Sequence, residues 1–227
     1  MDNARAMSFA QERLWFLDQL RPGAADYLLP LGLHIRGKLD VDALTGTFQA
    51  IVDRHEVLRT RYVAVDGMPA AVVDEHVEAT VEHTDDGDVL RREVGRPFDL
   101  AAGPPFRITL ARLGDDDHLV VFVVHHIAFD GWSWSVLARE LADGYRERTT
   151  IDPTDSEPAD TTPPALGYAE FAKWQRDRFT GERGRRQLDY WRAQLDDLPA
   201  LELPTDRPRP KTRDGSGDVV RFESRDR

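Results

Sequence analysis

The sequence contains no cysteine, so disulfides and thiol catalysis are excluded from the functions it can perform. It also lacks an apolar run near the length of a membrane span, and a signal peptide with a charged start and an apolar middle. Basic residues number 30 against 41 acidic ones, and the resulting net charge of −11 argues against nucleic acid as a partner. We therefore expect a cytoplasmic protein with no membrane or nucleic-acid partner.

The chain has 227 residues, of which 41% are hydrophobic, and this length and composition suffice for one large or two small globular domains. The sequence contains no apparent internal repeat. Ser8, followed three residues later by Gln11, is a capping-box signature for a first helix, which should place Leu14, Leu17 and Leu20 on its inward face. Asp40 is the expected N-cap of a second helix. Further helices are predicted over 88–94, from 136 onward, and over 168–198 with an interruption near 181–184. Strands are predicted over 28–36, 58–65, 70–73, 77–82, 106–113, 119–124 and 219–222. A solvated loop is predicted over 150–164 and an extended segment over 199–210.

The most informative stretch runs from Leu119 to Ser135 and reads LVVFVVHHIAFDGWSWS. Its first six residues do not alternate apolar with polar, so both faces of this strand should be covered inside a sheet. His125 and His126 follow at the strand's exit, and because neighbouring strand side chains point to opposite faces, only one imidazole should enter a cavity. Asp130 could cap the helix that follows.

Several kinds of site are compatible with this cluster. An imidazole exchanges a proton near neutrality, which suits acyl transfer to an amine or alcohol. The alternatives are a buried structural histidine pair, a zinc site made by His125, His126 and Asp130, or a Ser133 or Ser135 nucleophile with a histidine base. Adjacent strand residues diverge and no cysteine completes a tetrahedron, which disfavours zinc, and no Gly-x-Ser-x-Gly elbow supports a serine nucleophile.

The residues His125-His126-Ile-Ala-Phe-Asp130-Gly131 resemble the HHxxxDG motif of the condensation domains of nonribosomal peptide synthetases. Three further phrases resemble that family in the same order along the chain: Ser8-Phe-Ala-Gln-Glu-Arg-Leu-Trp, Arg54-His-Glu-Val-Leu-Arg-Thr, and Tyr168-Ala-Glu-Phe-Ala-Lys-Trp, in which Glu170 stands where the family usually has aspartate. The segment from Leu201 to Pro210 also resembles the corresponding segment of that family.

The resemblance implies an α/β fold of the chloramphenicol acetyltransferase type, a two-layer sandwich lobe in which a mixed sheet is flanked by helices. Residues 1–165 would form the N-terminal lobe of a condensation domain, and residues 166–227 would form linker helices and a crossover segment toward an absent C-terminal lobe. In the family, an acceptor amine attacks a donor thioester in a tunnel between the two lobes, and an amide results. No cofactor would be bound by this chain, because the substrates are carried on the phosphopantetheine of carrier proteins.

The resemblance also assigns roles to residues. His126 is the expected working imidazole, either as a base or as a hydrogen-bonding group that positions the amine. His125 and Asp130 would support it, Gly131 would allow a sharp turn and offer its amide to the oxyanion, and Trp132 and Ser133 would shape the site.

Arg59 and Arg61 should share a strand face. They are either exposed charges in solvent, or one of them is buried and pairs with Asp130 or another carboxylate. The arginines between Arg176 and Arg192 form a local basic patch, which is either a solvated helix face or a dock for a carrier protein.

The expected partners are donor and acceptor peptidyl carrier proteins, the C-terminal lobe, and an adenylation domain in the same assembly line. Two other functions stay open. The lobe could be a noncatalytic module that recognises carrier proteins, although an intact HHxxxDG motif favours the enzyme. It could also be a coenzyme A acyltransferase, although such enzymes lack the first two of the three additional phrases.

Overall fold

The computed structural model describes residues 4–150, 166–202, 204–208 and 211. The predicted strand at 219–222 and nearly all of the predicted loop at 150–164 lie outside these residues, as do parts of the extended segment at 199–210. The elements are β1 (Ala4–Arg5), α1 (Phe9–Leu20), β2 (Leu28–Arg36), α2 (Val41–Arg54), the short 3-10 helix η1 (Glu56–Arg59), β3 (Thr60–Val65), β4 (Met68–Val73), β5 (Val81–Thr84), α3 (Val89–Val94), β6 (Phe106–Gly114), β7 (Asp117–His125), α4 (Ser133–Thr149), α5 (Tyr168–Thr180) and α6 (Glu182–Gln194).

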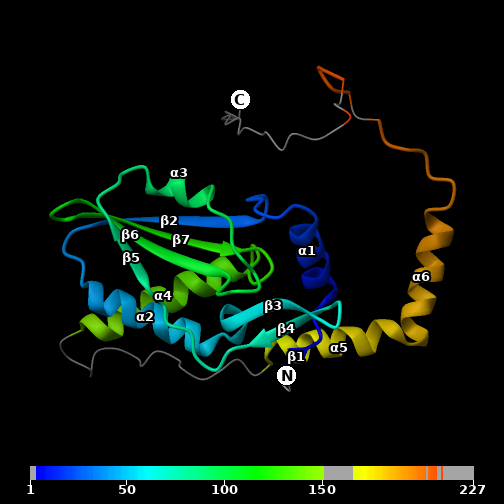
Figure 1. Cartoon of the computed structure of the whole chain (residues 1–227), viewed down its shortest axis with the longest axis horizontal. Helices are drawn as coiled ribbons and strands as arrows, with labels where there is room; N and C mark the ends of the chain where they lie inside the picture. The colour runs from blue at the N-terminus through cyan, green and yellow to red at the C-terminus, as the bar shows by residue number, and fades with distance from the viewer. Residues whose placement is uncertain (1–3, 151–165, 203, 209–210, 212–227) are drawn as a thin grey trace, which may run out of the picture.

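The main sheet has the strand order β2-β7-β6-β5, and only the β5–β6 pair is parallel. The predicted mixed sheet flanked by helices is therefore confirmed: α2 and α4 lie together along one face, and α3 lies over the other (Figure 1). A second sheet of order β1-β4-β3 lies beside α5 (Figure 1).

The central strand β7 is buried on both faces, as its unbroken apolar run predicts. Val120, Phe122 and Val124 belong to the core under α2 and α4, whereas Val121 and Val123 pack with Val89 of α3 on the opposite face. Complete burial of a side chain of this size contributes about 1.5–3 kcal/mol. The strand is therefore a rigid support for whatever follows its last residue.

Local signals place the helix starts well. Ser8 and Gln11 form the predicted capping box, and Asp40 accepts a hydrogen bond from the backbone N–H of Ala43 as the N-cap of α2. Leu14 is buried, but Leu20 is 64% exposed, so the prediction that Leu20 faces inward is wrong. A 3-10 helix occupies 56–59, so β3 begins at Thr60, two residues later than predicted.

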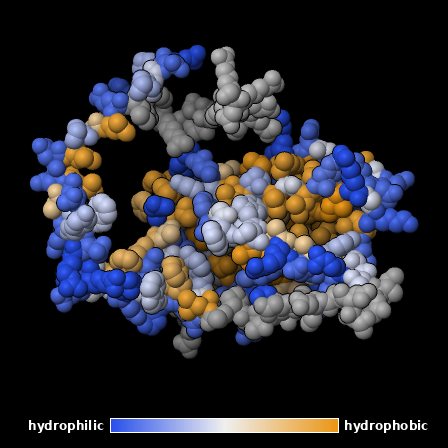
Figure 2. Space-filling view, turned by 180° about the vertical axis from the view of Figure 1, so that it is seen from behind, coloured by the Kyte–Doolittle hydropathy of each residue, from blue (hydrophilic) through white to orange (hydrophobic). Residues whose placement is uncertain are grey.

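Helices α5 and α6 form an arm that leaves the body of the lobe (Figure 1). At the root of the arm, Arg176 bonds the Met7 carbonyl and pairs with Glu12, so this arginine serves an internal contact. Figure 2 shows hydrophobic side chains exposed along the arm. On α6 and just beyond it, the exposed apolar and aromatic residues are Leu188, Tyr190, Trp191 and Leu195. Among the described residues, none of the helices has the combined length and hydropathy of a transmembrane span.

Candidate active site

The end of β7 is clamped by the strands on both sides. The backbone N–H of His125 donates to the carbonyl of Pro105, before β6, and the N–H of His126 donates to the carbonyl of Tyr27, before β2. Both bonds measure 2.8 Å. The chain then turns sharply, and the N–H of Ala128 returns to the carbonyl of His125. These main-chain hydrogen bonds fix the backbone of both histidines independently of their side-chain contacts.

His125 points into the protein and is 4% exposed. Its ring lies near the rings of Tyr27 and Phe98, with centroid distances of 6.4 and 6.5 Å. Its Nδ1 accepts a hydrogen bond of 3.0 Å from the backbone N–H of Ile127, which requires an unprotonated nitrogen at that position. Burial, and secondarily the charge of His126, lowers the pKa of His125 to about 4, so this ring is neutral at neutral pH.

His126 faces the other way and is exposed. Its Nδ1 lies 2.7 Å from the carbonyl oxygen of Phe129. A carbonyl oxygen only accepts, so Nδ1 carries the proton, and the lone pair of the neutral ring is on Nε2. The turn therefore selects one tautomer of an exposed imidazole and leaves its basic nitrogen free of the turn's own hydrogen bonds.

Asp130 organises the start of α4. Its Oδ1 accepts hydrogen bonds from the backbone N–H groups of Trp132 and Ser133, both 3.0 Å, and from the Ser133 hydroxyl at 2.8 Å. The Ser133 hydroxyl first, together with these N–H groups and the nearby His126, holds the pKa of Asp130 below its usual range. The carboxylate is thus an anchor for the loop, and Ser133 supports the loop through the same oxygen.

The arginines expected near this loop have other partners. Arg59 lies in η1, where its guanidinium donates to the carbonyls of Val52, Asp53, Asp74 and Glu75. Arg61 forms a two-pronged pair with the carboxylate of Asp74, both bonds measuring 2.8 Å. Pairing with Asp130 is therefore wrong, and Arg61 has the alternative partner, another carboxylate. The 3-10 helix turns Arg59 toward main-chain carbonyls at the end of α2 and after β4.

Gly131 and Trp132 also differ from expectation. Gly131 is not among the glycines with positive φ, and a Cβ built there would meet open space, so the backbone itself does not require glycine. Trp132 is 82% exposed, so its indole is not packed as a support. Both residues instead leave the outer surface of the loop open.

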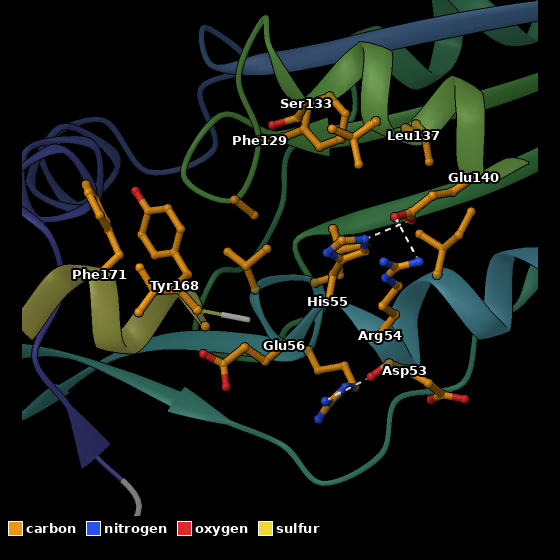
Figure 3. Close-up of a pocket in the computed structure, with 18 of the residues that line it drawn as sticks. Asp53, Arg54, His55, Glu56, Phe129, Ser133, Leu137, Glu140, Tyr168 and Phe171 are labelled. Carbon is orange, nitrogen blue, oxygen red and sulfur yellow. Dashed lines mark hydrogen bonds and ion pairs between the residues drawn. The ribbon is translucent and has the colours of Figure 1, made fainter. Parts of the chain in front are cut away.

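A cavity of about 870 Å³ lies on the side of the loop formed by Phe129 and Ser133, and His126 is not part of its wall (Figure 3). Its polar groups pair with one another. Glu140 holds His55 at 2.8 Å and Arg54 at 3.4 Å, and Glu56 accepts from the backbone N–H of Ala169. The Glu140 pairs join α4 to the end of α2, and the Glu56 bond joins η1 to α5.

The sequence analysis missed the charged cluster behind His125. Glu93 of α3 is 1% exposed, and Arg107 of β6 contacts it at 2.7 Å. Burial alone would raise the pKa of Glu93, but the hydrogen bonds from Arg107 and Arg92 outweigh it and lower this pKa. The Arg107 guanidinium also lies 4.2 Å from the centre of the Phe98 ring, which abuts His125. An arginine within the apolar strand sequence of β6 was the available signal.

His125 and His126 point in opposite directions and so do not converge on one ion with Asp130. Within the described part of the chain, no group of three or more His, Asp or Glu side chains is placed to hold a metal.

A mixed sheet with helices on both faces and a histidine pair at the exit of its buried central strand defines a lobe of the chloramphenicol acetyltransferase-like class. Comparison with known proteins agrees. The X-domain in the complex of X-domain and OxyB from teicoplanin biosynthesis superposes with a TM-score of 0.76 at 30% identity, over 91% of this chain and 47% of that one.

The Condensation domain family matches residues 1–227, and the chain therefore belongs to that family. It is 43% identical over 225 residues to cyclosporin synthetase simA of Tolypocladium inflatum and 41% identical over 224 residues to nonribosomal peptide synthetase kk1B of Curvularia clavata. These matches cover 94% and 95% of this chain but only 1% and 2% of those proteins. The chain thus spans a small part of the relatives it matches and about half of the solved chain.

Proposed function

We propose that this chain is the histidine-bearing lobe of a condensation domain that forms an amide between a carrier-bound acyl or peptidyl thioester and a carrier-bound aminoacyl thioester. The observation that carries the proposal is the state of His126. Its ring is exposed at the end of a rigid strand, and the Phe129 carbonyl fixes the proton on Nδ1. Family membership supplies the reaction class.

In this reaction the acceptor amine attacks the donor thioester carbon, a C–N bond forms, and the C–S bond breaks. Nε2 of His126 accepts the proton that the amine loses and passes that proton to the departing thiolate of the donor arm, which leaves as a thiol and returns the imidazole to its neutral form. General base catalysis of this kind is worth about 10² to 10⁴ in rate. Alignment of two tethered reactants can contribute more, so a hydrogen bond from the amine to Nε2 also serves positioning.

The neighbouring residues maintain that geometry. His125 stays neutral and holds the turn through the N–H of Ile127. Asp130 and Ser133 fix the start of α4. Gly131 leaves open space on the outer surface, where the tetrahedral centre would pass and where its amide could meet the oxyanion. The hydrogen bonds of His125, Asp130 and Ser133 and the open space at Gly131 support these proposed roles.

Family membership supports the proposed partners, and an exposed apolar surface supports one of them, the C-terminal lobe. Donor and acceptor carrier proteins would each present a phosphopantetheine arm, and an adenylation domain would load them. A C-terminal lobe would cover the apolar face of the arm, where Leu188 and Trp191 are 50% and 53% exposed. In this proposal residues 1–165 form the catalytic lobe and residues 166–227 lead to the second lobe, and no cofactor is held by the chain.

The test supplies the chain and a complementary C-terminal lobe with two loaded carrier proteins and follows dipeptidyl thioester by intact mass. We expect His126→Ala to lower the rate by about 10² to 10⁴. His76→Ala is the matched control, because His76 is a 70% exposed histidine that has only a 3.7 Å contact with Asp53. Equal product from wild type and His126→Ala would refute the catalytic assignment.

A binding function is the second candidate, because one solved relative of this fold is a domain in complex with another protein, OxyB. A binding lobe would retain carrier proteins with unchanged affinity in His126→Ala and form no product in the wild type. Turnover of an acyl-coenzyme A without carrier proteins would instead indicate a coenzyme A acyltransferase.

A further inference from the structure

Gln11 is an unusually well-connected residue for the first turn of a helix. Its side chain is 3% exposed. Oε1 accepts a hydrogen bond of 3.1 Å from the backbone N–H of Ser8, which completes the capping box of α1. The amide group Nε2 lies on the other side, 3.1 Å from the Tyr62 hydroxyl and 3.4 Å from the carbonyl oxygen of Ile127. Every hydrogen-bonding group of this amide except one lone pair is in use.

Ile127 is the residue that directly follows His126. Its N–H already binds His125, and its carbonyl is the group that the Gln11 amide reaches across 116 positions of sequence. Tyr62, which is 1% exposed, points its hydroxyl at the same carbonyl from 3.5 Å. The turn that orients the His126 ring is therefore held from inside by α1 and β3, in addition to the two strands that flank β7.

The helix that supplies this brace is itself fixed by α5. The Ser8 hydroxyl lies 3.3 Å from the Tyr168 hydroxyl, and the N–H of Phe9 donates to Gln175 at 3.0 Å. The path from Tyr168 through Ser8 and Gln11 to Ile127 joins two of the family phrases, those that begin at Tyr168 and Ser8, to the HHxxxDG loop.

Capping and bracing make different chemical demands. A capping box needs only an acceptor that reaches the N-cap N–H, and either glutamate or glutamine provides one. The carbonyl of Ile127 needs a donor, which glutamine has and ionised glutamate lacks. Glutamate at position 11 would cap α1 and at the same time place a buried carboxylate against a carbonyl oxygen.

We propose that Gln11 is a positioning residue for His126: its amide, together with the Tyr62 hydroxyl, holds the Ile127 carbonyl. This contact keeps the turn in the geometry in which the Nδ1–H of His126 donates to the Phe129 carbonyl. The proposal rests on the proposed function for its effect on rate. Its effect on the His126 ring does not depend on that function.

The test is Gln11→Glu in the chain assembled with its complementary C-terminal lobe. We expect kcat to fall by about 10-fold to 100-fold, the range for loss of a buried hydrogen bond, with KM for both loaded carriers unchanged. The ¹⁵N spectrum of the histidine rings should show His126 losing its single Nδ1–H tautomer. Burial raises the pKa of a carboxyl at this position, and its protonated form donates one hydrogen bond, so the deficit relative to wild type should narrow as pH falls.

Gln19→Glu is the matched control. Gln19 lies on the same helix, is exposed, and binds only the neighbouring Asp18, so both kcat and the His126 spectrum should stay as in wild type. Tyr62→Phe, which keeps the ring and removes one hydroxyl, should give a smaller loss of kcat and the same spectral change, and it decides the case should Gln11→Glu not fold.

Two outcomes separate the proposals. A folded Gln11→Glu with wild-type kcat and an unchanged His126 spectrum overturns the brace and leaves the condensation function intact. A wild type that forms no dipeptidyl thioester overturns the function, and the ring spectra still show whether Gln11 orients His126.

Discussion

The two histidines at the end of β7 are consecutive residues with opposite environments. His125 lies between aromatic rings, is 4% exposed, and has a pKa lowered to about 4 by burial. His126 is exposed, and its Nδ1–H donates a hydrogen bond to the carbonyl of Phe129. The comparison shows how one strand exit gives the same side chain two environments, because the pleat sends one ring to the core and the turn sends the other to the surface.

The largest effect on the buried side should come from Arg107→Leu. It leaves Glu93, which is 1% exposed, without its closest cation and removes the guanidinium from the Phe98 ring. Breaking a buried pair costs about 3–5 kcal/mol of the free energy of unfolding, measured by urea denaturation.

Arg112→Leu is the control on the same strand, since the Arg112 and Asp115 side chains are 61% and 98% exposed. Such an exposed pair should contribute about 0–1 kcal/mol. Equal stability of the two variants would show that the buried side of the comparison does not depend on the charged cluster.

The next effect is the contribution of His125 to the pH dependence of stability. The folded pKa of about 4 lies below the unfolded value of 6.5, so below pH 6.5 the unfolded chain takes up a proton that the folded chain does not. Stability from this residue is therefore present above pH 6.5 and is lost progressively as pH falls toward 4, by about 3 kcal/mol in all.

The measurement compares urea unfolding of wild type and His125→Leu at pH 7 and pH 4.5. The variant should lose less stability on acidification than wild type does, whereas His76→Gln should follow wild type because His76 is 70% exposed. Parallel losses in wild type and His125→Leu would remove the contrast between the two histidines.

The smallest effect should come from Trp132→Ala. Its indole is 82% exposed, so truncation should change the free energy of unfolding by less than about 0.5 kcal/mol. A larger loss, measured by the same urea denaturation, would mean that the exposed side of the loop is packed. The environments of His125 and His126 would then differ less than proposed.

Much of the lobe could be read from local patterns. The capping box at Ser8 and Gln11, the N-cap at Asp40 and the strand at 28–36 all depend on residues a few positions apart. The errors fall where a local pattern is ambiguous. The predicted strand at 58–65 includes Leu58 and Arg59, but these residues end a 3-10 helix, because the chain must turn from α2 into β3.

The sequence by itself determined that a doubly buried strand ends in two histidines and that they face opposite ways, because burial and alternation are properties of a single segment with a fixed period. Only the tertiary structure decided the partners: Arg61 with Asp74, Arg107 with Glu93, and Gln11 with the Ile127 carbonyl. Partner choice depends on which elements pack side by side, and a hydrogen bond across 116 positions leaves no periodic trace in the chain.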